Sequence, residues 1–67
     1  DETAVDTLEN LMHNDPRPVI RGTAAWAIGK IGTPASRSII EQAMEKEEDE
    51  GVLEEMQKGI ALCKSVG

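Results

Sequence analysis

The side chains of this chain that are best suited to bind another molecule are mostly cationic and lie near its middle. Arg17, Arg21, Lys30 and Arg37 share this stretch with Trp26, the single tryptophan. Lysine and arginine bind phosphates, and an aromatic ring can stack on a nucleobase. These residues are therefore candidates for contact with a nucleic acid or another partner, although a solvated helix face is the commoner origin of such charges.

Two of these residues also have simpler structural explanations. Arg21 follows Asp15 by six positions, and we expect the two to form a largely exposed pair worth ~0–1 kcal/mol that orients the turn. Trp26 is flanked by Ala25 and Ala27, and we expect it to pack at an interface between repeats or domains. An exposed tryptophan at this position would instead mark a partner surface.

Residues suited to catalysis or metal binding are scarce. His13 is the single histidine and Cys63 the single cysteine. A structural zinc site or an iron–sulfur cluster takes four ligands, mostly Cys or His, so this chain alone holds neither. Cys63 has the register of a small core residue, and His13 that of a helix end. We therefore assign no catalytic, metal-binding or cofactor-binding residue.

The net charge of −6 limits the partners of the chain. An acidic domain is a poor general ligand for nucleic acid, so a contact with RNA has to be local. Positions 45–50 hold five acids and one lysine, which we interpret as a solvated turn; repulsion of RNA and binding of a basic partner are alternatives. No apolar run approaches the ~18 residues that span a membrane. Together with the lone cysteine, this favours a cytoplasmic protein.

The elements that position these residues form a repeat. An offset of 32 residues superposes the two halves of the chain in residue character. Ile20, Ala24, Ala27, Ile28 and Ile31 form an apolar stripe with helical spacing. Positions 52, 56, 59, 60 and 63 repeat that stripe as Val, Met, Gly, Ile and Cys.

Local sequence signals predict four helices, over residues 3–13, 18–31, 34–46 and 50–64. Proline suits the first position of the second and third helices, Gly32 is a left-handed stop, and Thr33 and Asp49 are candidate caps. The predicted fold is all-α, with two stacked antiparallel helix hairpins, as in a piece of an α-solenoid. Residues 1–32 would form the first repeat and residues 33–67 a terminal, degenerate one.

Gly22, Gly29 and Gly59 lie inside the predicted helices, where each costs about 1 kcal/mol relative to alanine. Close helix packing is the expected compensation for Gly59, which lies on the second stripe. Gly22 and Gly29 lie off the first stripe, and packing accounts for them less readily.

Residues 15–32 resemble a HEAT-like repeat of the kind named after phycobilin lyases. The second helix of that unit reads roughly Val-Arg-x-x-Ala-Ala-x-Ala-Leu-Gly, and residues 20–29 read Ile-Arg-Gly-Thr-Ala-Ala-Trp-Ala-Ile-Gly. Units of this kind carry an acid in the turn and a basic residue six positions later, as Asp15 and Arg21 do. In the second repeat Leu53 stands in place of that basic residue, as expected for a terminal repeat.

Within this group, residues 17–32 are similar to the C-terminal tail of the epoxyqueuosine reductases, including Gly22 and Trp26, which general repeats lack. The chain departs from that tail at Arg17 and Thr23, where the family often has histidine. The resemblance implies a parent that reduces epoxyqueuosine in tRNA with cobalamin and two 4Fe–4S clusters, held by an upstream domain.

By the same resemblance, this piece would be a non-catalytic module that supports the rest of the parent chain and helps to bind tRNA. Contacts with tRNA or a partner would come from Trp26 and from the cationic residues Arg17, Arg21, Lys30 and Arg37. The start at Asp1 rather than methionine also suggests a piece of a longer chain. A scaffold repeat of another HEAT-like protein that binds a protein partner, and a piece of a chromophore lyase, are the alternatives.

Two hairpins are fewer than the three or so repeats that a solenoid needs for stability. We therefore expect the isolated chain to be marginally stable, with a broad thermal transition at modest temperature by circular dichroism. A sharp transition at high temperature would contradict the predicted number of repeats or the interpretation as a piece of a longer chain.

Overall fold

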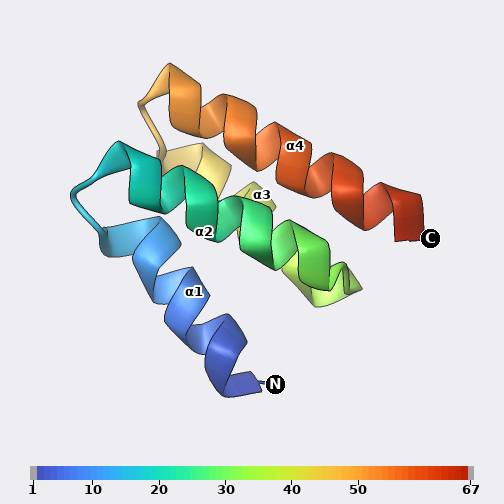
Figure 1. Cartoon of the computed structure of the whole chain (residues 1–67). Helices are drawn as coiled ribbons and strands as arrows, with labels where there is room; N and C mark the ends of the chain where they lie inside the picture. Colours follow the sequence, from blue (N-terminus) through green and yellow to red (C-terminus); the bar gives the residue numbers. More distant parts are fainter. Residues whose placement is uncertain (1, 67) are drawn as a thin grey trace.

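The computed structural model describes residues 2–66, and the side chains of residues 4–63. The described chain forms the helices α1 (Glu2–Asn14), α2 (Pro18–Ile31), α3 (Pro34–Lys46) and α4 (Glu50–Val66), without a strand (Figure 1). The predicted all-α fold is confirmed, with the bounds of α2 and α3 as predicted and slightly longer α1 and α4. Division into repeats at residue 32 remains a prediction. None of the described helices is long and apolar enough to cross a membrane.

The helix ends follow the local chemistry of the sequence. Gly32 has a φ of 72°, in the left-handed region that suits glycine, and its N–H donates to Ile28 O, which ends α2. Thr33 Oγ1 accepts from Ser36 N at 3.1 Å and caps α3. Asp49 Oδ1 accepts from Val52 N at 3.0 Å and caps α4. These predicted signals are confirmed.

The helices pair as two hairpins, α1 with α2 and α3 with α4. α2 and α4 lie side by side and run in the same direction (Figure 1), and theirs is the most extensive contact between helices. The outer sides of α2 and α4 therefore belong to one face of the molecule, as the second helices of successive repeats do in a solenoid.

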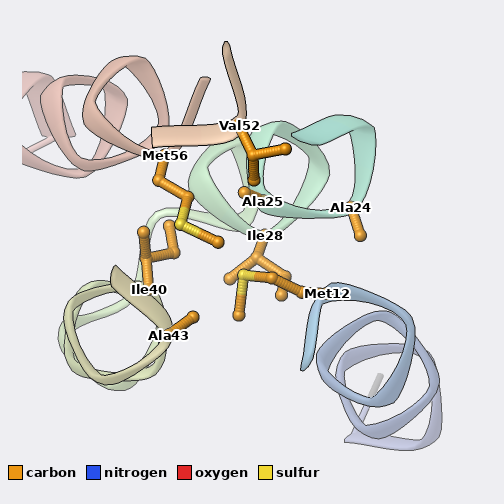
Figure 2. Packing of buried hydrophobic residues seen from close by; sticks show 8 residues of the cluster. All are labelled: Met12, Ala24, Ala25, Ile28, Ile40, Ala43, Val52 and Met56. Atoms are coloured by element: carbon orange, nitrogen blue, oxygen red, sulfur yellow. The ribbon is translucent and has the colours of Figure 1, made fainter. Parts of the chain in front are cut away.

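The core lies where the four helices meet. Met12, Ile28, Ile40 and Met56 are fully buried there, one from each helix, and point toward a common centre (Figure 2). Burying a side chain of this size contributes about 1.5–3 kcal/mol. Alanines at 24, 25 and 43 let the helices approach around these larger side chains.

The first predicted stripe is confirmed only in part. Ala24 and Ile28 are buried, Ile20 and Ala27 are half-buried, but Ile31 is 42% exposed, and its predicted burial is wrong. Its counterpart Cys63 is buried because it packs back against the first hairpin, where its thiol donates to Gly29 O at 3.8 Å.

The second stripe is confirmed more fully. Val52, Met56, Gly59 and Cys63 are all buried, and Ile60 is half-buried. All of these positions lie on α4, which has the first hairpin beside it.

Close packing explains Gly22, Gly29 and Gly59, which corrects the expectation for Gly22 and Gly29. A Cβ on Gly29 would lie 2.5 Å from Gly59 Cα and 2.5 Å from Gly59 O. A Cβ on Gly59 would lie 2.8 Å from Ala25 O, and one on Gly22 would lie 3.2 Å from Glu55 Cγ. The backbones of α2 and α4 are therefore in contact at Gly29 and Gly59.

The substitution Gly29→Ala tests this contact. Alanine favours the helix by about 1 kcal/mol, but here the backbone of α4 would have to move. We expect a net loss of about 1–3 kcal/mol in the free energy of unfolding, measured by urea unfolding followed by circular dichroism.

The matched control is Gly51→Ala. A Cβ there meets only the carboxylate end of Asp49, at 3.2 Å. We expect a change within about 0.5 kcal/mol. Equal stability of Gly29→Ala and the unaltered chain would contradict the close contact of α2 and α4.

Candidate functional site

Arg21 joins the two turns at one end of the molecule. Its Nε donates to Glu47 Oε1 at 2.8 Å and its Nη2 to Glu47 Oε2 at 3.0 Å, a bidentate ion pair. Its Nη1 donates to the main-chain oxygen of Asp15 at 2.9 Å. The side chains of Arg21 and Glu47 are 17% and 6% exposed, so this ion pair is mostly shielded from water.

The pKa values reflect this pairing. The hydrogen bond from Arg21 lowers the pKa of Glu47 below its ordinary value of 4.5, against an opposing effect of burial, and the N–H of Asp49 adds to the lowering. The same contact raises the pKa of Arg21. Arg21 is thus charged but already paired, with three of its five N–H groups donating within the protein.

The predicted pair of Asp15 and Arg21 differs from what the structure shows. The two residues are in contact, but through the main-chain oxygen of Asp15, and Arg21 is not largely exposed. The Asp15 carboxylate pairs instead with Arg17, at 2.9 Å to Nη2 and 3.0 Å to Nε. Hydrogen bonds from Arg17 lower the pKa of Asp15 to about 2.

Sequence reasoning missed Glu47 as the partner of Arg21, although two signals pointed to it. The offset of the repeat places Glu47 on Asp15, and Leu53 stands where the second repeat would carry its own arginine. Glu47 therefore lacks the basic residue six positions later in its own hairpin, and Arg21 of the first hairpin pairs with it instead.

The outer face of α2 carries the more accessible candidates. Val19, Thr23, Trp26 and Lys30 are all exposed and follow one another at helical spacing. Lys30 Nζ lies 4.4 Å from the centroid of the Trp26 ring, a cation–π contact. Trp26 is 39% exposed, so the two hairpins do not bury it. Its predicted packing at an interface between repeats or domains stays a prediction, and its exposed ring marks a candidate partner surface.

The remaining predicted contact residues lie apart from this face. Arg17 is exposed at the turn before α2 and paired with Asp15. Arg37 is exposed on α3, where its Nε donates to Glu41 Oε2 at 3.2 Å. The structure thus brings Trp26 and Lys30 together and places Arg17 at the other end of α2. Arg21 is paired with Glu47 at the end of α3, and Arg37 with Glu41 on its own helix.

The residues present do not by themselves form a site for the iron–sulfur clusters that the family resemblance implies. Cys63 is the single cysteine of the chain and is buried, whereas an iron–sulfur cluster takes four ligands, mostly thiolates. Among the described residues, no group of three or more His, Cys, Asp or Glu side chains is placed to hold a metal ion. His13 lies 3.9 Å from Glu9 on the same helix, through Nε2 and Oε2.

The chain is similar to known proteins in both sequence and fold. The family of HEAT repeats matches residues 1–61. The chain belongs to the HEAT-repeat family. This HEAT-repeat chain is also 60% identical, over its whole length, to epoxyqueuosine reductase of Bacillus subtilis (strain 168), and 55% identical over 60 residues to that of Bacillus cereus. The predicted resemblance is confirmed.

Solved structures agree with this similarity. A crystal structure of epoxyqueuosine reductase with an epoxyqueuosine-modified tRNA-Tyr stem loop superposes on 96% of the HEAT-repeat chain with a TM-score of 0.88 and 61% identity. The chain spans 17% of the length of that protein, 17% of the Bacillus subtilis relative and 16% of the Bacillus cereus relative.

The substitution Glu47→Gln tests the ion pair that joins the turns. It keeps the shape of the side chain but removes its charge, and we expect a loss of about 1–3 kcal/mol in the free energy of unfolding at neutral pH. The pKa of Glu47 is lower in the folded state, so below pH 4.5 the unfolded chain takes up this proton first. The contribution of this ion pair to stability is therefore fully present above pH 4.5, and it is lost as the pH decreases through the lowered pKa of Glu47.

Glu47→Gln should make unfolding less dependent on pH in this acidic window, as measured by urea unfolding over a pH series. Glu41→Gln is the matched control, because it neutralises the exposed pair with Arg37 on one helix. It should change stability by no more than ~1 kcal/mol. Equal effects of the two substitutions would contradict a special role for Glu47.

Proposed function

We propose that the HEAT-repeat chain is a non-catalytic module of a protein of the epoxyqueuosine reductase type, where it supports the catalytic part and helps to bind tRNA. The observation that carries this proposal is the identity of 60% across the whole chain. A relative at 61% identity that was crystallised with a tRNA stem loop supports the choice of tRNA.

The exposed face of α2 suits a modest, local contact with phosphates. Arg17 and Lys30 lie at opposite ends of the helix, about 20 Å apart at 1.5 Å per residue. Lys30 is already oriented by the Trp26 ring. Arg17 is paired with Asp15, but its side chain is 70% exposed. Arg21 and Arg37 are assigned a minor part, because Arg21 is mostly shielded by its pair with Glu47 and Arg37 lies on α3. Two cations on a chain of net charge −6 give weak binding that is sensitive to salt.

The chemistry of the longer protein belongs to residues outside this chain. Cobalamin and two 4Fe–4S clusters remain the proposed cofactors of that protein, and the HEAT-repeat chain contributes no ligand to the clusters. Reduction of a modified base in tRNA also suits a cytoplasmic location, which we retain as part of the proposal.

Titration of the chain with a tRNA anticodon stem loop at low salt tests the RNA contact. We expect amide chemical-shift changes to cluster at Arg17 and Lys30, and at Trp26 through its contact with Lys30, and to fade as salt is added. Lys30→Glu should weaken binding and reduce the slope of log affinity against log salt by about 1.

Lys46→Glu is the matched control, because Lys46 also lies in the last turn of its helix but on α3. It should leave the affinity for the stem loop within about twofold of the unaltered chain, since it lies off the proposed contact face. Equal losses from Lys30→Glu and Lys46→Glu would indicate a general charge effect. Absence of chemical-shift changes at millimolar RNA would contradict the proposed RNA contact and favour a module that binds only protein.

A further inference from the structure

The outer face of α2 borders a hollow between the first turns of α2 and α4. Val19 and Trp26 line one side of this hollow, and Asp49 and Glu55 lie on the side of α4. Val19 is 77% exposed, and with Trp26 it makes two of the three large hydrophobic side chains that are exposed within the described residues. Exposed apolar side chains that gather at one concave place indicate a binding surface.

Glycines keep the hollow open. Gly22 and Gly51 line it without side chains, and a Cβ on Gly22 would press against the side chain of Glu55. Any other residue at position 22 would therefore both displace Glu55 and narrow the hollow. Gly22, which the helical pattern alone does not explain, is thus tied to this surface as well as to packing.

The charges around the hollow select its occupant. Asp49 uses Oδ1 to cap α4, and Glu55 faces Lys58 at 3.6 Å in an exposed pair of little strength. Both carboxylates repel a phosphate and attract a cation. An occupant that is apolar next to a positive charge complements the surface, whereas an RNA backbone does not.

We propose that this hollow binds a polypeptide segment of the same longer protein, outside these residues, which inserts an apolar side chain and presents a lysine or arginine to Asp49 and Glu55. The inference rests on the proposed function, since it names the surface through which the module supports the rest of the chain. The relatives carry most of their length outside the matching segment, which is 17% of the Bacillus subtilis protein. Because the segment belongs to the same chain, its effective concentration at the hollow is high, so a small contact area is sufficient for binding.

Photocrosslinking in a hybrid protein tests the docking surface. The segment of Bacillus subtilis epoxyqueuosine reductase that matches this chain is replaced by the chain itself, with p-benzoylphenylalanine at Thr23, an exposed residue that lines the hollow. Irradiation without RNA should give a crosslink within one chain, to a residue outside the inserted segment and beside a lysine or arginine. The same amino acid at Ser38, exposed on α3, should not reach that residue.

Charge reversal then tests whether the acidic side chains of the hollow contribute to binding of the segment. Glu55→Lys should reduce the yield of the crosslink at least threefold, and Glu54→Lys, an exposed neighbour that does not line the hollow, should leave it unchanged. Circular dichroism of each hybrid establishes that it is folded before irradiation.

Other outcomes overturn the proposal. Absence of a crosslink from Thr23 would mean that the hollow has no partner. A crosslink between two chains would assign the hollow to a second copy, and a crosslink that forms only with added stem loop would assign it to RNA. Lys30→Glu distinguishes this proposal from the proposed function: docking predicts an unchanged crosslink, whereas the tRNA contact predicts weaker RNA binding. If RNA binding is absent and the crosslink persists, the docking surface stands and the tRNA role fails.

Discussion

The arrangement of the molecule depends on the close approach of α2 and α4 at Gly29 and Gly59. Because neither residue has a side chain, the two backbones come into contact, and the hairpins stack without a gap. The small residue Ala25 and the thiol of Cys63 fill the same interface. This approach places the second helices of both hairpins on one face, and so determines which side chains are left for a partner.

The ion pair of Arg21 and Glu47 acts at the other end of the same interface. It connects the turns of the two hairpins through two short hydrogen bonds, and the third bond to Asp15 O fixes the first turn as well. A buried or half-buried pair of this kind costs desolvation, so its net contribution is smaller than its geometry suggests. Its consequence for function is clear: it removes one arginine from the set available to phosphates and keeps an acid from repelling them.

The exposed face of α2 then shows two kinds of chemistry side by side. Arg17 and Lys30 at its ends suit phosphates, whereas the hollow between them is apolar and bordered by acids from α4. A repeat module that both packs against the rest of its own protein and contacts RNA needs two such separate surfaces, because one surface cannot attract phosphate and a basic side chain equally. The net charge of −6 makes the division sharper, since it confines any RNA contact to the few exposed cations.

The sequence by itself determined the helices, because their ends depend on local chemistry: proline at first positions, Gly32 in the left-handed region, and the caps Thr33 and Asp49. It also determined the family, because the motif around Trp26 lies within one helix. Only the tertiary structure decided the partners. Helical periodicity specifies which residues share a face, not which neighbour covers it, so the exposure of Ile31 and the role of Gly29 depended on the stacking of the hairpins. The partner of Arg21 lies 26 positions away, and only the stacking of the hairpins brings Glu47 within reach.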